Sequence, residues 1–212
     1  MGYLEALRCA RRLEWKFNAL CYGDSTTQGV SYDSLPNPAY PTLQRYGYPW
    51  KLRELIEAQT GYPCDEFPAR VGRGGCNIAG FRATVDADLN SRPGRVDFAL
   101  VNIGKGDYNV LITQQHVSDT LYIVDSLLVR YPGVKVYLAR PWQPRAPMSQ
   151  WNDLAHCFEL VEQQRFPQVL PGIDERLFLE NGDNGATYTY SNHPNHAGYM
   201  RIAEEWLRVL LA

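Results

Sequence analysis

The segment VDFALVNI, residues 96–103, decides the fold class of this chain. It is a mostly apolar run that ends at Gly104, and a short apolar run bounded by a glycine indicates a buried strand. Three further segments give the same kind of signal. They are residues 17–22, which end at Gly23, residues 65–71 and residues 134–139.

Segments with helical spacing separate these strands, and four of them are clear: residues 49–60, 118–130, 150–164 and 197–211. Pro49 opens the first and Gly61 follows it, while Ser118 is a suitable N-cap for the second. Strands that alternate with helices predict parallel pairing through right-handed crossovers. We therefore expect a single domain over residues 1–212, a flavodoxin-like three-layer α/β/α sandwich with a five-stranded parallel sheet.

Composition narrows the possible functions. Lys and Arg number 21 against 23 Asp and Glu, so no strong field of one sign favours nucleic acid as a partner. No apolar run reaches about 18 residues, so we expect no membrane span. Residues 1–16 lack the apolar region of a signal peptide, which favours the cytoplasm. The five cysteines suggest neither a disulfide framework nor zinc, although a bridge between Cys64 and Cys76 stays open.

Four turns carry residues suited to chemistry: GDST at 23–26, GRGG at 72–75, GKGD at 104–107 and SNHPNHAGY at 191–199. Three of them follow predicted strands, and ligands of open α/β sheets bind outside the carboxyl ends of strands. A serine hydroxyl becomes a nucleophile only beside a base, and His193 can supply one. Taken singly, each turn is equally typical of ordinary structure. His193 and His196 lack the acidic partner of a zinc motif, so we expect no metal.

Taken in order, the four turns resemble the sequence blocks of the SGNH (GDSL-type) hydrolase family. GDSTTQG is similar to the nucleophile block, GRGG to the glycine block, LVNIGKGD to the GxND block and NHPNHAGY to the histidine block. The resemblance covers about residues 17–208. It implies the SGNH hydrolase fold without a cofactor, Ser25 as nucleophile and His193 as base. It also implies an oxyanion hole formed at Ser25, Gly72 and Gly106, with Gly75 as the alternative to Gly72.

Two departures from the family pattern bear on the mechanism. The family has Asn at the position of Gly106, and that side chain donates to the oxyanion; its replacement is open between Asn77, Asn102, Asn109, Lys105 and a water molecule. The family also has an acid three residues before the histidine, where this chain has Tyr190. Three outcomes follow: a backbone carbonyl orients His193 in a Ser–His dyad, Asp183 acts as the acid, or the site is impaired.

Asp24, Lys105 and Asn77 are the residues expected beside a substrate. Asp24 could instead shape its turn, and Lys105 could be a solvated loop residue. The expected reaction is hydrolysis of short-chain carboxylic esters through an acyl-enzyme, with carbohydrate O-acetyl groups favoured by the family's range, so the partner is a small-molecule or carbohydrate ester. One alternative is an impaired SGNH-fold module that binds a sugar or acyl ligand. Another is a nucleotide or phosphate binder that uses the turn at residues 72–75.

Overall fold

The computed structural model describes residues 18–29, 47–61, 69–92, 94–142, 147–179, 189–190 and 193–212. Within them the chain forms a five-stranded sheet in the order β2-β1-β3-β4-β5, and every neighbouring pair is parallel. The strands are β1 (Ala19–Gly23), β2 (Ala69–Gly72), β3 (Phe98–Asn102), β4 (Lys135–Arg140) and β5 (Val169–Asp174). The predicted five-stranded parallel sheet is confirmed.

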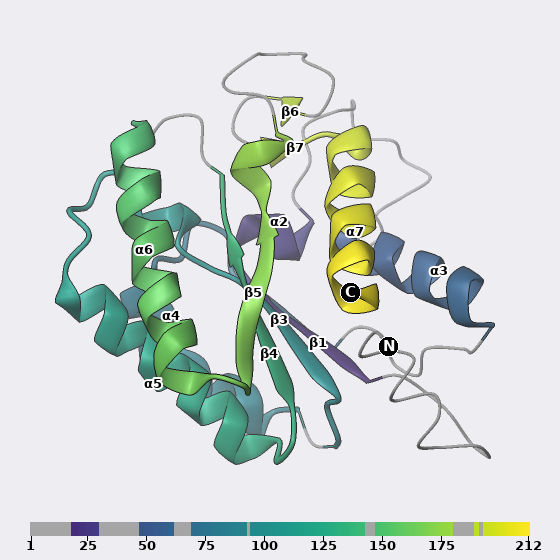
Figure 1. Ribbon diagram of the computed structural model, residues 1–212, viewed down its shortest axis with the longest axis horizontal. Helices are drawn as coiled ribbons and strands as arrows, with labels where there is room; N and C mark the ends of the chain where they lie inside the picture. Colours follow the sequence, from purple (N-terminus) through teal and green to yellow (C-terminus); the bar gives the residue numbers. More distant parts are fainter. Residues whose placement is uncertain are drawn as a thin grey trace.

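Helices cover both faces of this sheet (Figure 1). One face carries α4 (Ile78–Asn90), α5 (Gln114–Arg130) and α6 (Met148–Arg165), and the other carries α3 (Tyr48–Thr60) and α7 (His196–Leu211). The molecule therefore has three layers, as the alternation of strands and helices predicts.

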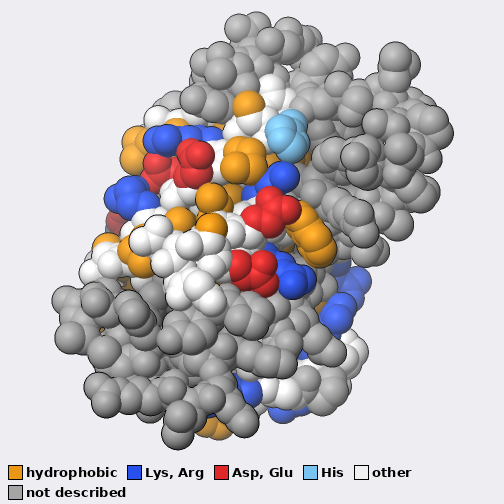
Figure 2. Space-filling view, turned by 90° about the vertical axis from the view of Figure 1, so that its right-hand side faces the viewer, with side chains coloured by type: hydrophobic (Ala, Val, Ile, Leu, Met, Phe, Trp, Pro, Cys, Tyr) orange, Lys and Arg blue, Asp and Glu red, His pale blue; other side chains and the backbone are white. Residues whose placement is uncertain are grey.

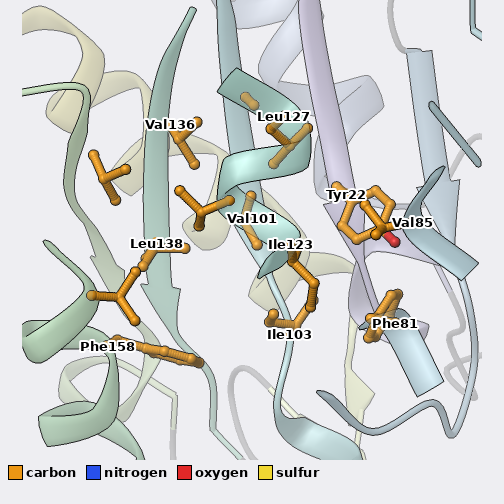
Figure 3. Close-up of a cluster of buried hydrophobic side chains, with 14 of the residues drawn as sticks. Tyr22, Phe81, Val85, Val101, Ile103, Ile123, Leu127, Val136, Leu138 and Phe158 are labelled. Carbon is orange, nitrogen blue, oxygen red and sulfur yellow. The ribbon is translucent and has the colours of Figure 1, made fainter. Parts of the chain in front are cut away.

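Each face of the sheet has its own hydrophobic core, because successive side chains of a strand point to opposite faces. Figure 3 shows the first core, in which Val101 of β3 and Leu138 of β4 lie against Ile123 of α5. The neighbouring residue Leu100 belongs to the second core, together with Trp206 of α7, and both are fully buried. The strands read as continuous apolar runs because both faces are covered.

The structure adds elements that the sequence analysis did not locate, and the two longest are β5 and α4. Strand β5 contains Pro171, which hides its strand signal; as the edge strand it has only β4 as a neighbour, so it tolerates a missing backbone N–H. Helix α5 begins at Gln114 with Thr113 as its N-cap, and the expectation of a start at Ser118 is corrected. Part of the predicted strand at residues 65–71 lies outside the described residues.

Short elements gather at the carboxyl ends of the strands. Helix α2 (Ser25–Gln28) follows β1, the 3₁₀ helix η2 (Lys105–Asp107) follows β3, and the 3₁₀ helix η3 (Glu175–Leu177) follows β5. A separate antiparallel pair, β6 (Thr189–Tyr190) and β7 (His193–Pro194), lies near this end, just before α7 (Figure 1). The four candidate turns therefore lie near the carboxyl ends of the strands.

Charges of both signs are mixed on the face that carries α3 and α7. Figure 2 shows acidic and basic side chains next to one another there, and ion pairs such as Arg53–Glu57 on α3 and Arg201–Glu205 on α7 account for part of this mixture. In the part of the chain that the structure describes, no helix is long and apolar enough to cross a membrane.

Candidate active site

Ser25 is presented by a tight turn between β1 and α2. Asp24 is the N-cap of α2 and its Oδ1 accepts a hydrogen bond from the Thr26 N–H at 2.9 Å, so the turn is fixed by its own side chain. The Asp24 N–H donates to the Asn102 carbonyl at 3.1 Å, which ties the end of β1 to the end of β3. Ser25 is therefore the first residue of a short helix at the carboxyl edge of the sheet.

The imidazole of His193 lies directly beside this serine. Its Nε2 is 2.8 Å from Ser25 Oγ, although the two residues are 168 positions apart in the sequence. His193 is in β7, where it pairs with Tyr190, and Asn195 caps the following helix α7 through the Gly198 N–H at 2.8 Å. The hairpin and the capped helix together deliver the imidazole to the nucleophile.

The glycine turn after β2 packs against the nucleophile helix. A Cβ added at Gly72 would lie 2.5 Å from Gln28 Cα, so this position is fixed by close packing against α2. A Cβ added at Gly74 would lie 3.7 Å from Ser25 Cβ, and the Gly74 N–H donates to Gln28 Oε1 at 3.0 Å. The structure thus brings Gly74 beside the nucleophile, where the sequence analysis had expected Gly72 or Gly75.

An ion pair and several hydrogen bonds hold the glycine turn, residues 72–75, against α4 and β1. Arg73 forms an ion pair with Asp88 of α4, and Asp88 also accepts hydrogen bonds from Tyr22 at 3.3 Å and Thr84 at 3.2 Å. The Arg73 N–H donates to the Gly23 carbonyl at 2.9 Å. The turn is therefore anchored both to β1 and to α4.

The position of Gly106 has no room for a side chain. A Cβ there would overlap the carbonyl oxygen of Cys76 and lie 2.9 Å from the Asn77 nitrogen. The next residue, Asp107, accepts a hydrogen bond from the Ile78 N–H at 3.0 Å. The backbone of Cys76 and Asn77 therefore occupies the space that a side chain at this position would need. Gly106 has no side chain and the structure leaves no room for one, so this position cannot supply the side-chain donor that the family's asparagine supplies.

Lys105 and Asp24 belong to a buried charge cluster, defined here as Asp24, Asn102, Lys105 and Glu175. All four side chains are at most 4% exposed. Lys105 Nζ donates to Thr26 Oγ1 at 3.1 Å, and Asn102 Nδ2 donates to Glu175 Oε1 at 2.7 Å. The expectation that Lys105 and Asp24 face the substrate is corrected, because the interior of the strand ends encloses both.

Burial shifts the pKa values within this cluster. Desolvation raises the pKa of Glu175 to about 7, against the opposing charge of Lys105 and a hydrogen bond from the Trp142 N–H at 3.1 Å. Desolvation also raises the pKa of Asp24 and lowers the pKa of Lys105, and in each case the oppositely charged neighbours work against the shift. One ammonium group faces two carboxyl groups, so the cluster favours one bound proton.

The other predicted site residues have different outcomes. The Asn77 side chain caps α4 by accepting a hydrogen bond from the Gly80 N–H at 2.9 Å, and Asn109 is exposed beyond η2. Asp183 lies outside the described residues, as does Cys64. Among the described residues, no group of three or more His, Cys, Asp or Glu side chains is placed to hold a metal ion.

A serine hydroxyl beside a histidine nitrogen, at the carboxyl edge of a parallel α/β sheet, is the arrangement that serine hydrolases use. No family model matches the sequence, and no curated protein matches it. Solved structures do share the fold. The psychrotrophic esterase EstA from Pseudoalteromonas sp. is 15% identical with a TM-score of 0.67, and the alignment covers 91% of this chain and 95% of that chain.

Two further solved structures share this fold, and the second carries a family name. TesA is 16% identical with a TM-score of 0.67, over 91% of this chain and 97% of that one. AlinE4, an esterase of the SGNH-hydrolase family, is 17% identical with a TM-score of 0.56, over 75% of this chain and 77% of that one. The chain therefore has the SGNH-hydrolase fold.

Proposed function

We propose that this protein is a serine esterase that hydrolyses short-chain carboxylic esters through an acyl-enzyme. The observation that carries the proposal is the 2.8 Å separation between Ser25 Oγ and His193 Nε2. That distance allows direct proton transfer between the two groups. Ser25 is 9% exposed and His193 is 7% exposed, so the protein encloses most of both side chains.

The first half of the reaction is acylation of Ser25. Ser25 Oγ forms a bond to the ester carbonyl carbon, its proton passes to His193 Nε2, and the carbonyl π electrons move onto the carbonyl oxygen. The intermediate then collapses. The bond to the leaving alkoxide breaks, His193 returns the proton to that oxygen, and the alcohol departs.

The second half releases the acid. A water molecule gives its proton to His193 Nε2 as its oxygen bonds to the acyl carbon, and the tetrahedral intermediate collapses by breaking the bond to Ser25 Oγ. The proton returns from His193 to that serine oxygen. The net reaction is ester plus water to carboxylic acid plus alcohol, with no change in the protein.

Backbone N–H groups are suited to hold the oxyanion of both tetrahedral intermediates. Ser25 is the first residue of α2, where the N–H has no partner within the helix. Gly74 offers the second N–H and takes the role that the sequence analysis had given to Gly72. Removing one donor of this kind typically lowers kcat by about 10²–10³-fold.

The leaving group and the third catalytic residue extend the proposal. Carbohydrate O-acetyl esters are the substrates that we favour, by resemblance to the range of the SGNH family. Asp183 stays our candidate for the acid that orients His193, with a backbone carbonyl as the alternative. The likeness to the esterases EstA and AlinE4 supports ester hydrolysis as the general reaction.

One alternative has a specific observation in its favour. Gly106 replaces the family's oxyanion asparagine, and its position has no space for a side chain. A chain with this change could bind a sugar or acyl ligand on the SGNH fold without turnover. A serine-directed fluorophosphonate probe separates the two functions, because only an activated serine is labelled.

Hydrolysis of p-nitrophenyl acetate by the wild-type protein and two variants tests the proposed function. We expect Ser25→Ala to abolish turnover and fluorophosphonate labelling, because the attacking atom is lost. We expect His193→Ala to lower kcat by several orders of magnitude with an unchanged melting temperature. A Ser25→Ala protein that retains the wild-type rate would refute the mechanism, and a wild-type protein that is neither active nor labelled would favour the binding module.

A further inference from the structure

We propose that the side-chain amide of Gln28 is the third donor of the oxyanion hole, in place of the asparagine that this chain lacks. This inference rests on the proposed esterase function, since an oxyanion forms only if Ser25 attacks a carbonyl. It assigns a catalytic role to a residue that neither the sequence motif nor the likeness to solved structures singles out.

The first step is the location of Gln28. It is the last residue of α2 and lies three positions after Ser25, so the two side chains share one side of the helix. Gln28 Oε1 accepts the Gly74 N–H at 3.0 Å, and Gly74 is the glycine that faces Ser25. The amide of Gln28 therefore already occupies the region where an oxyanion would receive the Gly74 N–H.

The second step is that other polar groups near the turn are committed elsewhere. Asn102 Nδ2 donates to Glu175 Oε1 at 2.7 Å. Lys105 Nζ donates to Thr26 Oγ1 at 3.1 Å. Gly106 has no space for a side chain, and Asn109 is exposed. Asn77 is the remaining rival, with its Oδ1 used to cap α4.

The third step is how an acceptor in the resting enzyme becomes a donor. In the structure the carbonyl end of the Gln28 amide takes the Gly74 N–H, as the developing oxyanion would. When that oxyanion forms it replaces Oε1 on the Gly74 N–H, and the amide turns about its terminal torsion to direct Nε2–H at the same oxygen. The terminal torsion of glutamine is broad and roughly two-fold, so the exchange needs no movement of α2.

Two variants of Gln28 separate a donor from a merely structural contact. Gln28→Glu keeps an oxygen that can accept the Gly74 N–H but has no N–H to donate, and Gln28→Met removes both functions at similar size. A donor role predicts that both variants lose kcat by about 10²–10³-fold, with KM changed much less. A structural role predicts that Gln28→Glu loses no more kcat than Asn77→Asp, which also adds a charge near the site, while Gln28→Met loses kcat.

Three further proteins complete the experiment, with kcat and KM for p-nitrophenyl acetate and the melting temperature measured for all. Gln163→Glu makes the same substitution at an exposed position on α6, near the other end of the sheet, and should match the wild type. Asn77→Asp keeps an N-cap oxygen while removing an amide donor and adding a charge. The wild type shows whether the site turns over an ester at all.

The outcomes separate the two proposals. Loss of kcat in both Gln28 variants, with the loss in Asn77→Asp much smaller, supports Gln28 as the donor. A wild-type kcat in either Gln28 variant, or a loss in Asn77→Asp as large as that in Gln28→Glu, overturns it while ester hydrolysis at Ser25 stands. A wild-type protein without turnover or fluorophosphonate labelling removes the proposed function and, with it, the role of Gln28.

Discussion

Replacing Glu175 with glutamine should change how the stability of this protein depends on pH. Glu175 is fully buried within the charge cluster, and burial raises its pKa from 4.5 to about 7. Between these two values the folded state binds a proton that the unfolded state has released, so the free energy of unfolding falls as pH rises. A glutamine side chain at this position cannot titrate, so the substitution removes this part of the dependence.

The interval between the two pKa values sets the size of the effect. It extends from 4.5 to about 7, and each pKa unit corresponds to about 1.4 kcal/mol, so Glu175 accounts for about 3 kcal/mol. The physical cause is burial: above pH 7 the Glu175 carboxylate is charged in a desolvated interior, and the nearby Lys105 offsets only part of that cost. The raised pKa of Asp24 also lowers the free energy of unfolding as pH rises. Asp24 is present in both the wild type and Glu175→Gln, so its contribution is common to the two proteins.

The substitution fits the surroundings of residue 175. Glu175 accepts hydrogen bonds from the Trp142 N–H and from Asn102 Nδ2. Among the described residues, Asn102 Oδ1 has no hydrogen-bond partner. A glutamine can keep the first bond with its oxygen and donate to Asn102 Oδ1 once that amide has turned over. We therefore expect a folded variant in which the charge alone has changed.

Urea unfolding followed by tryptophan fluorescence measures the effect at pH 5, 6, 7 and 8. We expect the difference in unfolding free energy between Glu175→Gln and the wild type to shift by about 2.5 kcal/mol in favour of the variant from pH 5 to pH 8, since part of the interval lies below pH 5. Glu204→Gln, at an exposed glutamate on α7, is the matched control and should show no such shift. A difference that stays constant over this pH range would refute the reasoning.

Two other substitutions probe the same edge of the sheet. Lys105→Met should lower the free energy of unfolding by about 3–5 kcal/mol at pH 8, because it leaves two buried carboxyl groups without their cation; a loss under about 1 kcal/mol in urea unfolding would contradict the cluster. Gly106→Ala should destabilise the fold by about 1–3 kcal/mol, since the new methyl group overlaps the Cys76 carbonyl. An unchanged melting temperature for Gly106→Ala would show that the backbone of Cys76 and Asn77 moves aside at no cost.

The sequence predicts the sheet and the catalytic pair because both depend on local signals. Residues 96–103 must be apolar since both faces of β3 are covered, and this requirement is visible without knowledge of any contact. Ser25 and His193 stand at the ends of elements, in turns that glycine, aspartate and proline mark clearly. The parallel topology then brings those turns to one edge, so the meeting of the pair follows from the strand order.

The rest of the site depends on contacts between segments far apart in the chain. Lys105 reads as a loop lysine, and only the packing of three strand ends shows that its ammonium is enclosed with Glu175, which the sequence analysis did not single out. The candidate for the glycine N–H donor depends on tertiary contacts: Gly72 lies against the Gln28 backbone, whereas Gly74 lies beside Ser25. No local sequence pattern indicates this difference. Tertiary packing therefore decides which groups are candidate donors, while sequence motifs indicate the proposed nucleophile and base.

The charge cluster and the reacting pair are adjacent along one turn, and this adjacency limits how variants can be interpreted. Ser25 faces His193, whereas its neighbours Asp24 and Thr26 contact the cluster, through the N-cap bond at 2.9 Å and the Lys105 bond at 3.1 Å. We therefore expect a substitution of Asp24 or Lys105 to displace Ser25 even though neither side chain reacts. Lost activity identifies a reacting or donating group at this site only when the free energy of unfolding is unchanged, which is the comparison that Gln28 and Lys105 require.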